Sequence, residues 1–171
     1  MSDFNEHALE MSIMQLFQDQ NYEYVSGEKI HRERTEVLLV DDLKQYLYSR
    51  YAQDGITPSE VDSIVLMLRN TSGTLYEANK AIYKMICDGF IFNREDRTQK
   101  DIFIELIDFE NPENNIFKVV NQFEIVGMNN QMRIPDGIVF VNGIPVVVLE
   151  FKSAIKENTT IMDAYTQLTV R

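Results

Sequence analysis

The stretch from residue 135 to residue 152, PDGIVFVNGIPVVVLEFK, constrains the fold more than any other part of this chain. An Asn-Gly pair at positions 142 and 143 separates two apolar runs rich in valine and isoleucine, a pattern typical of a β-hairpin. Asp136 stands at the start of the first run, and Glu150 and Lys152 close the second. Burying such charges at the end of an apolar hairpin is costly unless they are paired. A divalent metal ion and a phosphate group would suit all three side chains.

The length of the hairpin loop decides whether the two acids can act together, because side chains alternate between the faces of a strand. With a two-residue loop at Asn142 and Gly143, Asp136 and Glu150 would point to opposite faces. A three-residue loop that begins at Val141, or a one-residue bulge after a shorter loop, would bring both acids and the lysine to one face. We predict that the hairpin contains such an odd-residue offset.

On one face, these three residues would form a candidate catalytic site. Carboxylate oxygens suit Mg²⁺ or Mn²⁺, so Asp136 and Glu150 are the candidate metal ligands. Lys152 could orient an attacking water or neutralise charge on a phosphate. The alternative is an exposed pair of Glu150 and Lys152 worth about 0–1 kcal/mol, with Asp136 as a turn residue. The spacing alone favours neither interpretation.

The composition is that of an ordinary globular protein, and its net charge limits what the chain can bind. The 171 residues are enough for one domain, with 44% hydrophobic and 25% charged residues. The sequence has one cysteine, no apolar run of about 20 residues and no signal-peptide pattern at its start, which indicates a cytoplasmic protein without a membrane partner. The net charge of −11 predicts that the chain alone binds DNA weakly.

The hydrophobic periodicity changes along the chain, from helical before about residue 89 to strand-like after about residue 90. A helical part over about 1–89 and a sheet with a closing helix over about 90–171 predict a mixed α+β or α/β fold. We expect helices over 4–17, 37–51, 57–68, 75–87 and 161–171, and strands or extended segments over 22–25, 90–93, 101–109, 117–126, 137–141 and 146–151.

Several stretches resemble a known family of nucleases. Pro135-Asp136 and Glu150-Phe151-Lys152 match the PD-(D/E)xK motif. DFENPENNIFKVVNQF, RIPDGIVFVNGIPVVVLEFKSA and DAYTQL resemble the N-terminal endonuclease domain of the type I restriction enzyme R subunit, HsdR. The N-terminal LFQDQNYEYVSGE and the later YEANKAIYKMICDGF also fit this family, so the resemblance covers most of the chain.

The resemblance implies a single nuclease domain over 1–171, with a restriction-endonuclease-like mixed sheet flanked by helices. Its implied activity is that of a type I site-specific deoxyribonuclease that cuts duplex DNA with Mg²⁺, or Mn²⁺, as cofactor. Asp136 and Glu150 match the family's metal ligands, and Lys152 matches its catalytic lysine. The runner-up function is a docking or structural module with a nuclease fold and little or no cleavage by itself.

The family also implies partners that this chain does not contain. In the complete subunit an ATP-driven DNA translocase follows the nuclease domain, and separate modification and specificity subunits complete the enzyme. The 171 residues contain no GxxxxGK[ST] phosphate-binding loop, so we assign ATP to the motor domains and not to this chain.

Three further residues are weaker candidates. Gln167 matches the glutamine of the Gln-x-x-x-Tyr motif with which the family holds DNA, but Arg171 stands where the tyrosine is expected. Arg171 could contact a phosphate instead. Glu77 lies on a predicted helix before the sheet, where related nucleases place a further metal-facing acid, although a solvent-exposed helix face explains it more simply.

Overall fold

The computed structural model describes residues 6–127, 130–151 and 161–169, and it has the mixed α/β fold that the sequence predicts. The chain divides into two compact units. The sheet unit comprises Met1–Val37, Phe117–Phe140 and Ile144–Arg171, and the helical unit comprises Leu38–Ile116 and Val141–Gly143. The predicted single nuclease domain spans both units and stays a prediction.

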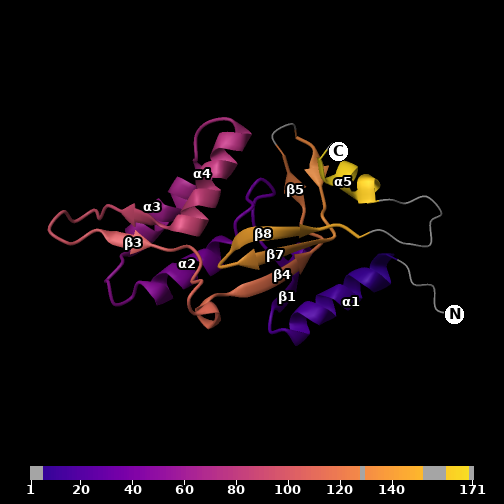
Figure 1. The fold of residues 1–171 in the computed structure, drawn as a ribbon, viewed down its shortest axis with the longest axis horizontal. Helices are drawn as coiled ribbons and strands as arrows, with labels where there is room; N and C mark the ends of the chain where they lie inside the picture. Colours follow the sequence, from indigo (N-terminus) through magenta and orange to yellow (C-terminus); the bar gives the residue numbers. More distant parts are fainter. Residues whose placement is uncertain (1–5, 128–129, 152–160, 170–171) are drawn as a thin grey trace. The chain divides into compact units, whose positions relative to one another are not determined.

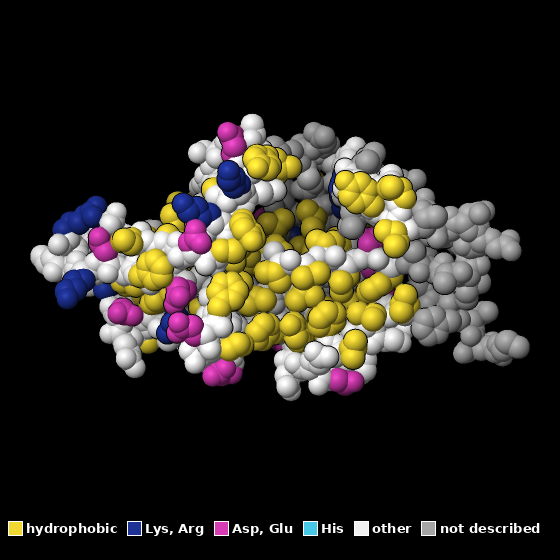
Figure 2. Space-filling model, viewed as in Figure 1, with side chains coloured by type: hydrophobic (Ala, Val, Ile, Leu, Met, Phe, Trp, Pro, Cys, Tyr) yellow, Lys and Arg dark blue, Asp and Glu magenta, His cyan; other side chains and the backbone are white. Residues whose placement is uncertain are grey.

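The sheet unit is built on a four-stranded sheet with the strand order β1-β4-β7-β8 (Figure 1). β1 and β4 are parallel, with Glu23 opposite Lys118 and Ser26 opposite Asn121. β8 lies at one edge of the sheet, and its Val146, Val147 and Val148 are all exposed. Figure 2 shows apolar side chains gathered over this region. The bounds are β1 Glu23–Ser26, β4 Phe117–Asn121, β7 Gly137–Val141 and β8 Ile144–Leu149.

Helix α1, Glu6–Asp19, packs against β1 and β4 and defines what we call the α1 face of the sheet. Met14 of α1 is fully buried against Val119 of β4 and Val139 of β7. Burying such side chains stabilises the unit by about 1.5–3 kcal/mol each. The partly buried residues that complete this core are Phe17, Tyr22, Tyr24, Leu149 and Phe151.

The expected long strand over 117–126 is wrong, because the chain leaves the sheet after Asn121. Gln122 adopts a left-handed backbone with φ of 51°, which an extended strand cannot contain. Residues beyond it form a separate two-stranded sheet of β5, Ile125–Val126, and β6, Met132–Arg133. The short β1 likewise ends beside this point, where a Cβ on Gly27 would lie only 2.5 Å from the Gln122 carbonyl oxygen.

The helical unit has its core between helices α2 and α3. Leu43 and Leu47 of α2 and Ile64 of α3 are fully buried. Both α3 and α4 begin with a capping box, in which Thr57 and Thr74 cap the helices. The bounds are α2 Val40–Arg50, α3 Pro58–Arg69, α4 Leu75–Asp88, β2 Phe90–Phe92 and β3 Ile102–Ile104.

The expected strand over 101–109 is also longer than the one that forms. β3 pairs with β2 only over Ile102–Ile104. The alternation nevertheless continues as a burial pattern, because Leu106 and Asp108 are as buried as Ile102 and Ile104. The predicted closing helix is present as α5, Ile161–Thr169.

Candidate active site

The hairpin of β7 and β8 turns through two residues, not three. Asn142 and Gly143 have φ values of 51° and 76°, as in the tight turn for which Asn-Gly is the preferred pair. Val141 ends β7 and Ile144 begins β8. With unbroken alternation, this loop would place Asp136 and Glu150 on opposite faces of the sheet.

The alternation is broken within β8, and the predicted odd-residue offset is present. A Cβ on Gly137 would lie 3.5 Å from the Leu149 Cβ and 2.9 Å from the Met14 methyl group. Leu149 and Phe151 also pack against the core that contains Val139. Residues 137, 139, 149 and 151 therefore all face α1, an arrangement that a strict two-residue register does not allow.

Continuing the alternation by one residue at each end would bring Asp136 and Glu150 to one face, the face away from α1. Asp136 directly precedes β7 and Glu150 directly follows β8, and both are half-buried. The Asp136 Oδ2 atom accepts a hydrogen bond of 2.6 Å from the backbone N–H of Phe151. This charge-assisted bond ties Asp136 to the residue next to Glu150.

The remaining predicted site residues are placed less fully. Lys152 and Arg171 lie outside the described residues. Gln167 lies within helix α5, where the described part of the structure gives its backbone only. Their predicted roles stay predictions.

Glu77 has a structural role that accounts for its position in the sequence. Its Oε2 atom accepts hydrogen bonds of 2.8 Å from the backbone N–H and from the hydroxyl of Thr74. These bonds lower the pKa of the Glu77 carboxyl below its usual value. Glu77 belongs to the helical unit, whereas Asp136 and Glu150 belong to the sheet unit.

Asp136 and Glu150 fit the ligand chemistry of a hard divalent cation. Mg²⁺ usually keeps several waters and takes only one or two protein carboxylates. Two carboxylates would meet that requirement, with water and phosphate oxygens as the other ligands of the ion. Within residues 6–127, 130–151 and 161–169, no three His, Cys, Asp or Glu side chains gather as a metal-binding group.

Sequence reasoning did not find Glu10, an acid buried in the sheet unit. Glu10 lies on α1 with 7% of its surface exposed, and its Oε1 atom accepts hydrogen bonds from the amides of Asn121 (2.8 Å) and Gln122 (3.2 Å). The Tyr24 hydroxyl donates to the Asn121 side-chain oxygen at 3.1 Å. This cluster lies on the α1 face and braces the end of β4.

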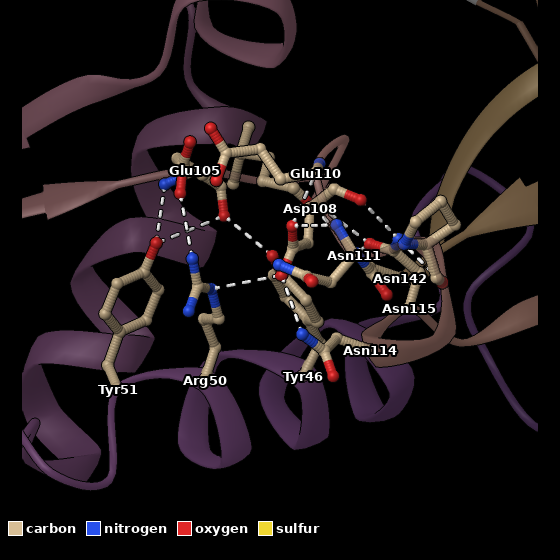
Figure 3. A network of polar contacts seen from close by, with 12 residues as sticks. Tyr46, Arg50, Tyr51, Glu105, Asp108, Glu110, Asn111, Asn114, Asn115 and Asn142 are labelled. Atoms are coloured by element: carbon tan, nitrogen blue, oxygen red, sulfur yellow. Dashed lines mark hydrogen bonds and ion pairs between the residues drawn. The ribbon is translucent and has the colours of Figure 1, made fainter.

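The turn of the hairpin is also held by side chains that the sequence did not single out (Figure 3). The fully buried Asn142 side chain accepts from the Ile116 N–H (2.7 Å) and donates to the Leu106 carbonyl (2.9 Å) and the Asn115 side-chain oxygen (2.8 Å). The Asn142 N–H donates to the Ile116 carbonyl at 2.8 Å, which sets β7 antiparallel to β4. The Gly143 carbonyl accepts a hydrogen bond from the Leu39 N–H, also at 2.8 Å.

The fold and the site together define a class: a mixed α/β protein with two carboxylates at the open end of a hairpin. The chain belongs to the family described as the type I restriction enzyme R protein N terminus, whose model matches residues 3–171. This family is the one that the hairpin motif and its surroundings predict.

Curated relatives carry matching descriptions. The chain is 32% identical, over 95% of its length, to the type I restriction enzyme HindI endonuclease subunit of Haemophilus influenzae. It is also 32% identical, over 94% of its length, to the putative type I restriction enzyme MjaIXP endonuclease subunit of Methanocaldococcus jannaschii. It spans only 16% of the length of each relative. Among the described helices, none has the length and apolarity needed to cross a membrane.

Proposed function

We propose that this chain is the Mg²⁺-dependent endonuclease module of a type I restriction enzyme, and that it hydrolyses phosphodiester bonds of duplex DNA. Mn²⁺ is an alternative cofactor. The observation that carries the proposal is the offset hairpin, whose open end carries Asp136 and Glu150 and in which Asp136 accepts the backbone N–H beside Glu150. Membership of the R-subunit family supports the same function.

Each site residue has a separate proposed role. Asp136 and Glu150 would hold the metal ion, which when bound supplies a more acidic water and stabilises charge on the phosphate. Lys152 would orient the attacking water or neutralise charge that develops on the phosphate. Gln167 and Arg171 would contact DNA next to the site.

The module would act within a larger assembly. We propose that translocase domains of the same polypeptide use ATP to move DNA, and that modification and specificity subunits choose the target. The relatives, which are about six times as long as this chain, leave room for such domains. The net charge of −11 supports a division of labour in which other parts of the complex hold most of the DNA.

Cleavage of supercoiled plasmid by the assembled complex tests this function. The wild type should cut with Mg²⁺ or Mn²⁺, whereas Asp136→Ala and Lys152→Ala should lose at least about 100-fold in rate, as expected for residues that act on the reacting groups. Equal cutting by all three proteins would end the catalytic proposal and favour a docking or structural module.

Glu77→Gln is the matched control, because it removes the charge of a carboxylate that lies outside the hairpin. Glutamine keeps an acceptor for the Thr74 N–H, so the helix cap is retained while the charge is removed. We expect cleavage and its metal requirement to stay unchanged. A metal requirement that rises in Glu77→Gln would instead support the role of Glu77 as a metal ligand.

A further inference from the structure

We propose that Asn142 and Asn115 are positioning residues of the nuclease site: by fixing the turn of the hairpin, they hold Asp136 and Glu150 in the register that binds metal. The inference rests on the proposed function and extends it to residues at the other end of the hairpin. Neither asparagine would touch DNA or the metal ion.

The first step is that the two amides form one hydrogen-bonded network with the loop before β4, in which Asn142 is fully buried and Asn115 is half-buried. The Asn115 side-chain oxygen accepts from both the Asn142 amide (2.8 Å) and the Asp108 N–H (2.9 Å). The Asn115 amide donates to the carbonyls of Asp108 (2.8 Å) and Pro112 (3.0 Å). The asparagine-rich segment over 111–115 is therefore a clamp around Asn142 and not only a surface turn (Figure 3).

The second step is that Asp108 braces the clamp. The Asp108 carboxylate accepts from the Asn111 N–H (2.9 Å) and from the Asn114 amide (2.8 Å), and Arg50 lies 3.7 Å from the same carboxylate. These contacts lower the pKa of Asp108, with the Asn114 hydrogen bond as the largest cause. The buried Asp108 is therefore ionised at neutral pH, the form in which its carboxylate accepts these hydrogen bonds.

The third step connects the clamp to the proposed catalytic residues. β7 has only five residues between Asp136 and Asn142, so a shift at the turn is carried along a single short strand. β8 breaks its alternation before Leu149, so pairing between the two strands does not by itself dictate which face Glu150 occupies. Fixing the turn from outside the hairpin sets where both strands begin, so a displaced turn would shift β7, which leads to Asp136, relative to β8, which leads to Glu150.

Metal binding by the purified chain tests the inference without requiring DNA cleavage. Asn142→Gly keeps the left-handed backbone of the turn and removes the side chain, and Asn115→Ala removes the other half of the clamp. In a calorimetric Mn²⁺ titration, we expect each variant to raise the Kd by about tenfold, as is typical when a residue supporting metal ligands is lost. The double variant should show less than the product of the two effects, since the asparagines share one hydrogen bond.

Asn93→Ala is the matched control, because it removes a side-chain hydrogen bond of 2.7 Å from the Asn93 amide to the Asp101 carboxylate, elsewhere in the helical unit. Its Kd for Mn²⁺ should equal that of the wild type. A purely structural role for the clamp would lower the fraction of chain that binds, and hence the stoichiometry, but would leave the Kd of the folded fraction unchanged. That result for Asn142→Gly and Asn115→Ala would overturn the inference. If Asn142→Gly does not fold, Asn115→Ala decides the question alone.

Asp136→Asn separates this inference from the proposed function. Loss of Mn²⁺ binding in Asp136→Asn, together with weakened binding in the clamp variants, supports both. Loss in Asp136→Asn with wild-type binding in the clamp variants rejects the positioning role only. Wild-type Mn²⁺ binding by Asp136→Asn rejects the metal site itself, and the positioning role falls with it.

Discussion

Asp136 combines a structural contact with a proposed chemical role in a single carboxylate. Its Oδ2 atom accepts the Phe151 N–H at 2.6 Å, which uses part of the carboxylate's capacity for hydrogen bonds. The two roles can be separated by substitution, because asparagine keeps an acceptor oxygen and alanine does not.

We predict that Asp136→Asn and Asp136→Ala differ in stability but not in activity. Asp136→Asn should change the free energy of unfolding by less than about 0.5 kcal/mol, and Asp136→Ala should cost about 1–3 kcal/mol because the Phe151 N–H loses its acceptor. Both should abolish Mg²⁺-dependent cleavage. Urea denaturation together with the plasmid assay checks this, and cleavage retained by Asp136→Asn would contradict the role of a charged ligand.

Gly143 is required by its backbone and by its surroundings. Its φ of 76° is unfavourable for other residues, and an added Cβ would lie 2.1 Å from the Leu39 carbonyl oxygen. We predict that Gly143→Ala costs about 2–3 kcal/mol in the free energy of unfolding. Gly127→Ala is the matched control, since among the residues that the structure describes a Cβ there would meet only the Gln131 carbonyl oxygen, at 3.9 Å. It should stay within about 0.5 kcal/mol of the wild type in urea denaturation.

At the scale of elements, the start of helix α3 joins a helix cap to a buried ion pair. Glu60 accepts the Thr57 N–H at 2.9 Å in the capping box, and its two oxygens lie 2.9 and 2.8 Å from Nε and a terminal nitrogen of Arg94. Arg94 also donates to the carbonyls of Asp54 and Gly55, so one guanidinium holds the loop before α3 and the segment after β2 together.

This pair predicts how the stability of the chain depends on pH. The hydrogen bonds from Arg94 lower the pKa of Glu60 to about 2, below the value of about 4.3 expected in an unfolded chain. The folded state therefore binds the Glu60 proton less readily, and the stabilisation is fully present above about pH 4.3 and is lost as the pH falls toward about 2. Urea midpoints measured between pH 7 and pH 3 should decrease with falling pH.

Glu60→Gln provides the control for this pH dependence. The variant should be less stable than the wild type at pH 7, because Arg94 remains buried without its charged partner. Its urea midpoint should also change less between pH 7 and pH 3. An equally steep decrease in both proteins would assign the acid sensitivity to other carboxylates, such as Asp108.

Which elements the sequence could predict depends on how local their causes are. The α3 helix was found from Thr57, Pro58 and Glu60, because a capping box is formed by residues three positions apart. The overlong strand over 117–126 had no local warning, since a left-handed Gln122 follows from tertiary contacts and not from a glycine or proline. The strand over 101–109 failed for a different reason: alternating burial identifies an inner face but not a hydrogen-bonded partner.

The same distinction applies to the candidate site. The hairpin, its tight turn and the need for an odd-residue offset followed from the spacing of Asp136, Asn142 and Glu150. The sequence left open where the offset lies, and the structure places it inside β8. The clamp of Asn115 around Asn142 joins residues 27 positions apart, so no local pattern could have indicated it.

At the scale of the whole molecule, net charge and site chemistry pull DNA binding in opposite directions. The net charge of −11 repels DNA, and this repulsion opposes association at distances within about one Debye length. A divalent cation held between two carboxylates and a phosphate would reverse this repulsion locally. DNA binding by the isolated chain should therefore depend on the cation far more than binding by a basic DNA-binding domain does.

We predict that the isolated chain binds a short DNA duplex with a Kd of about 10⁻⁴ M or weaker at physiological salt when no divalent cation is present. Adding Ca²⁺, which binds oxygen ligands, should tighten DNA binding about tenfold, a coupling typical of two ligands that share a site. The measurement does not require DNA cleavage. Fluorescence anisotropy measures both values, and Asp136→Asn should remove the effect of Ca²⁺ while leaving the weak cation-free binding unchanged. A micromolar Kd without any divalent cation would show that this chain itself supplies most of the affinity for DNA. That result would contradict the proposal that other parts of the complex hold most of the DNA.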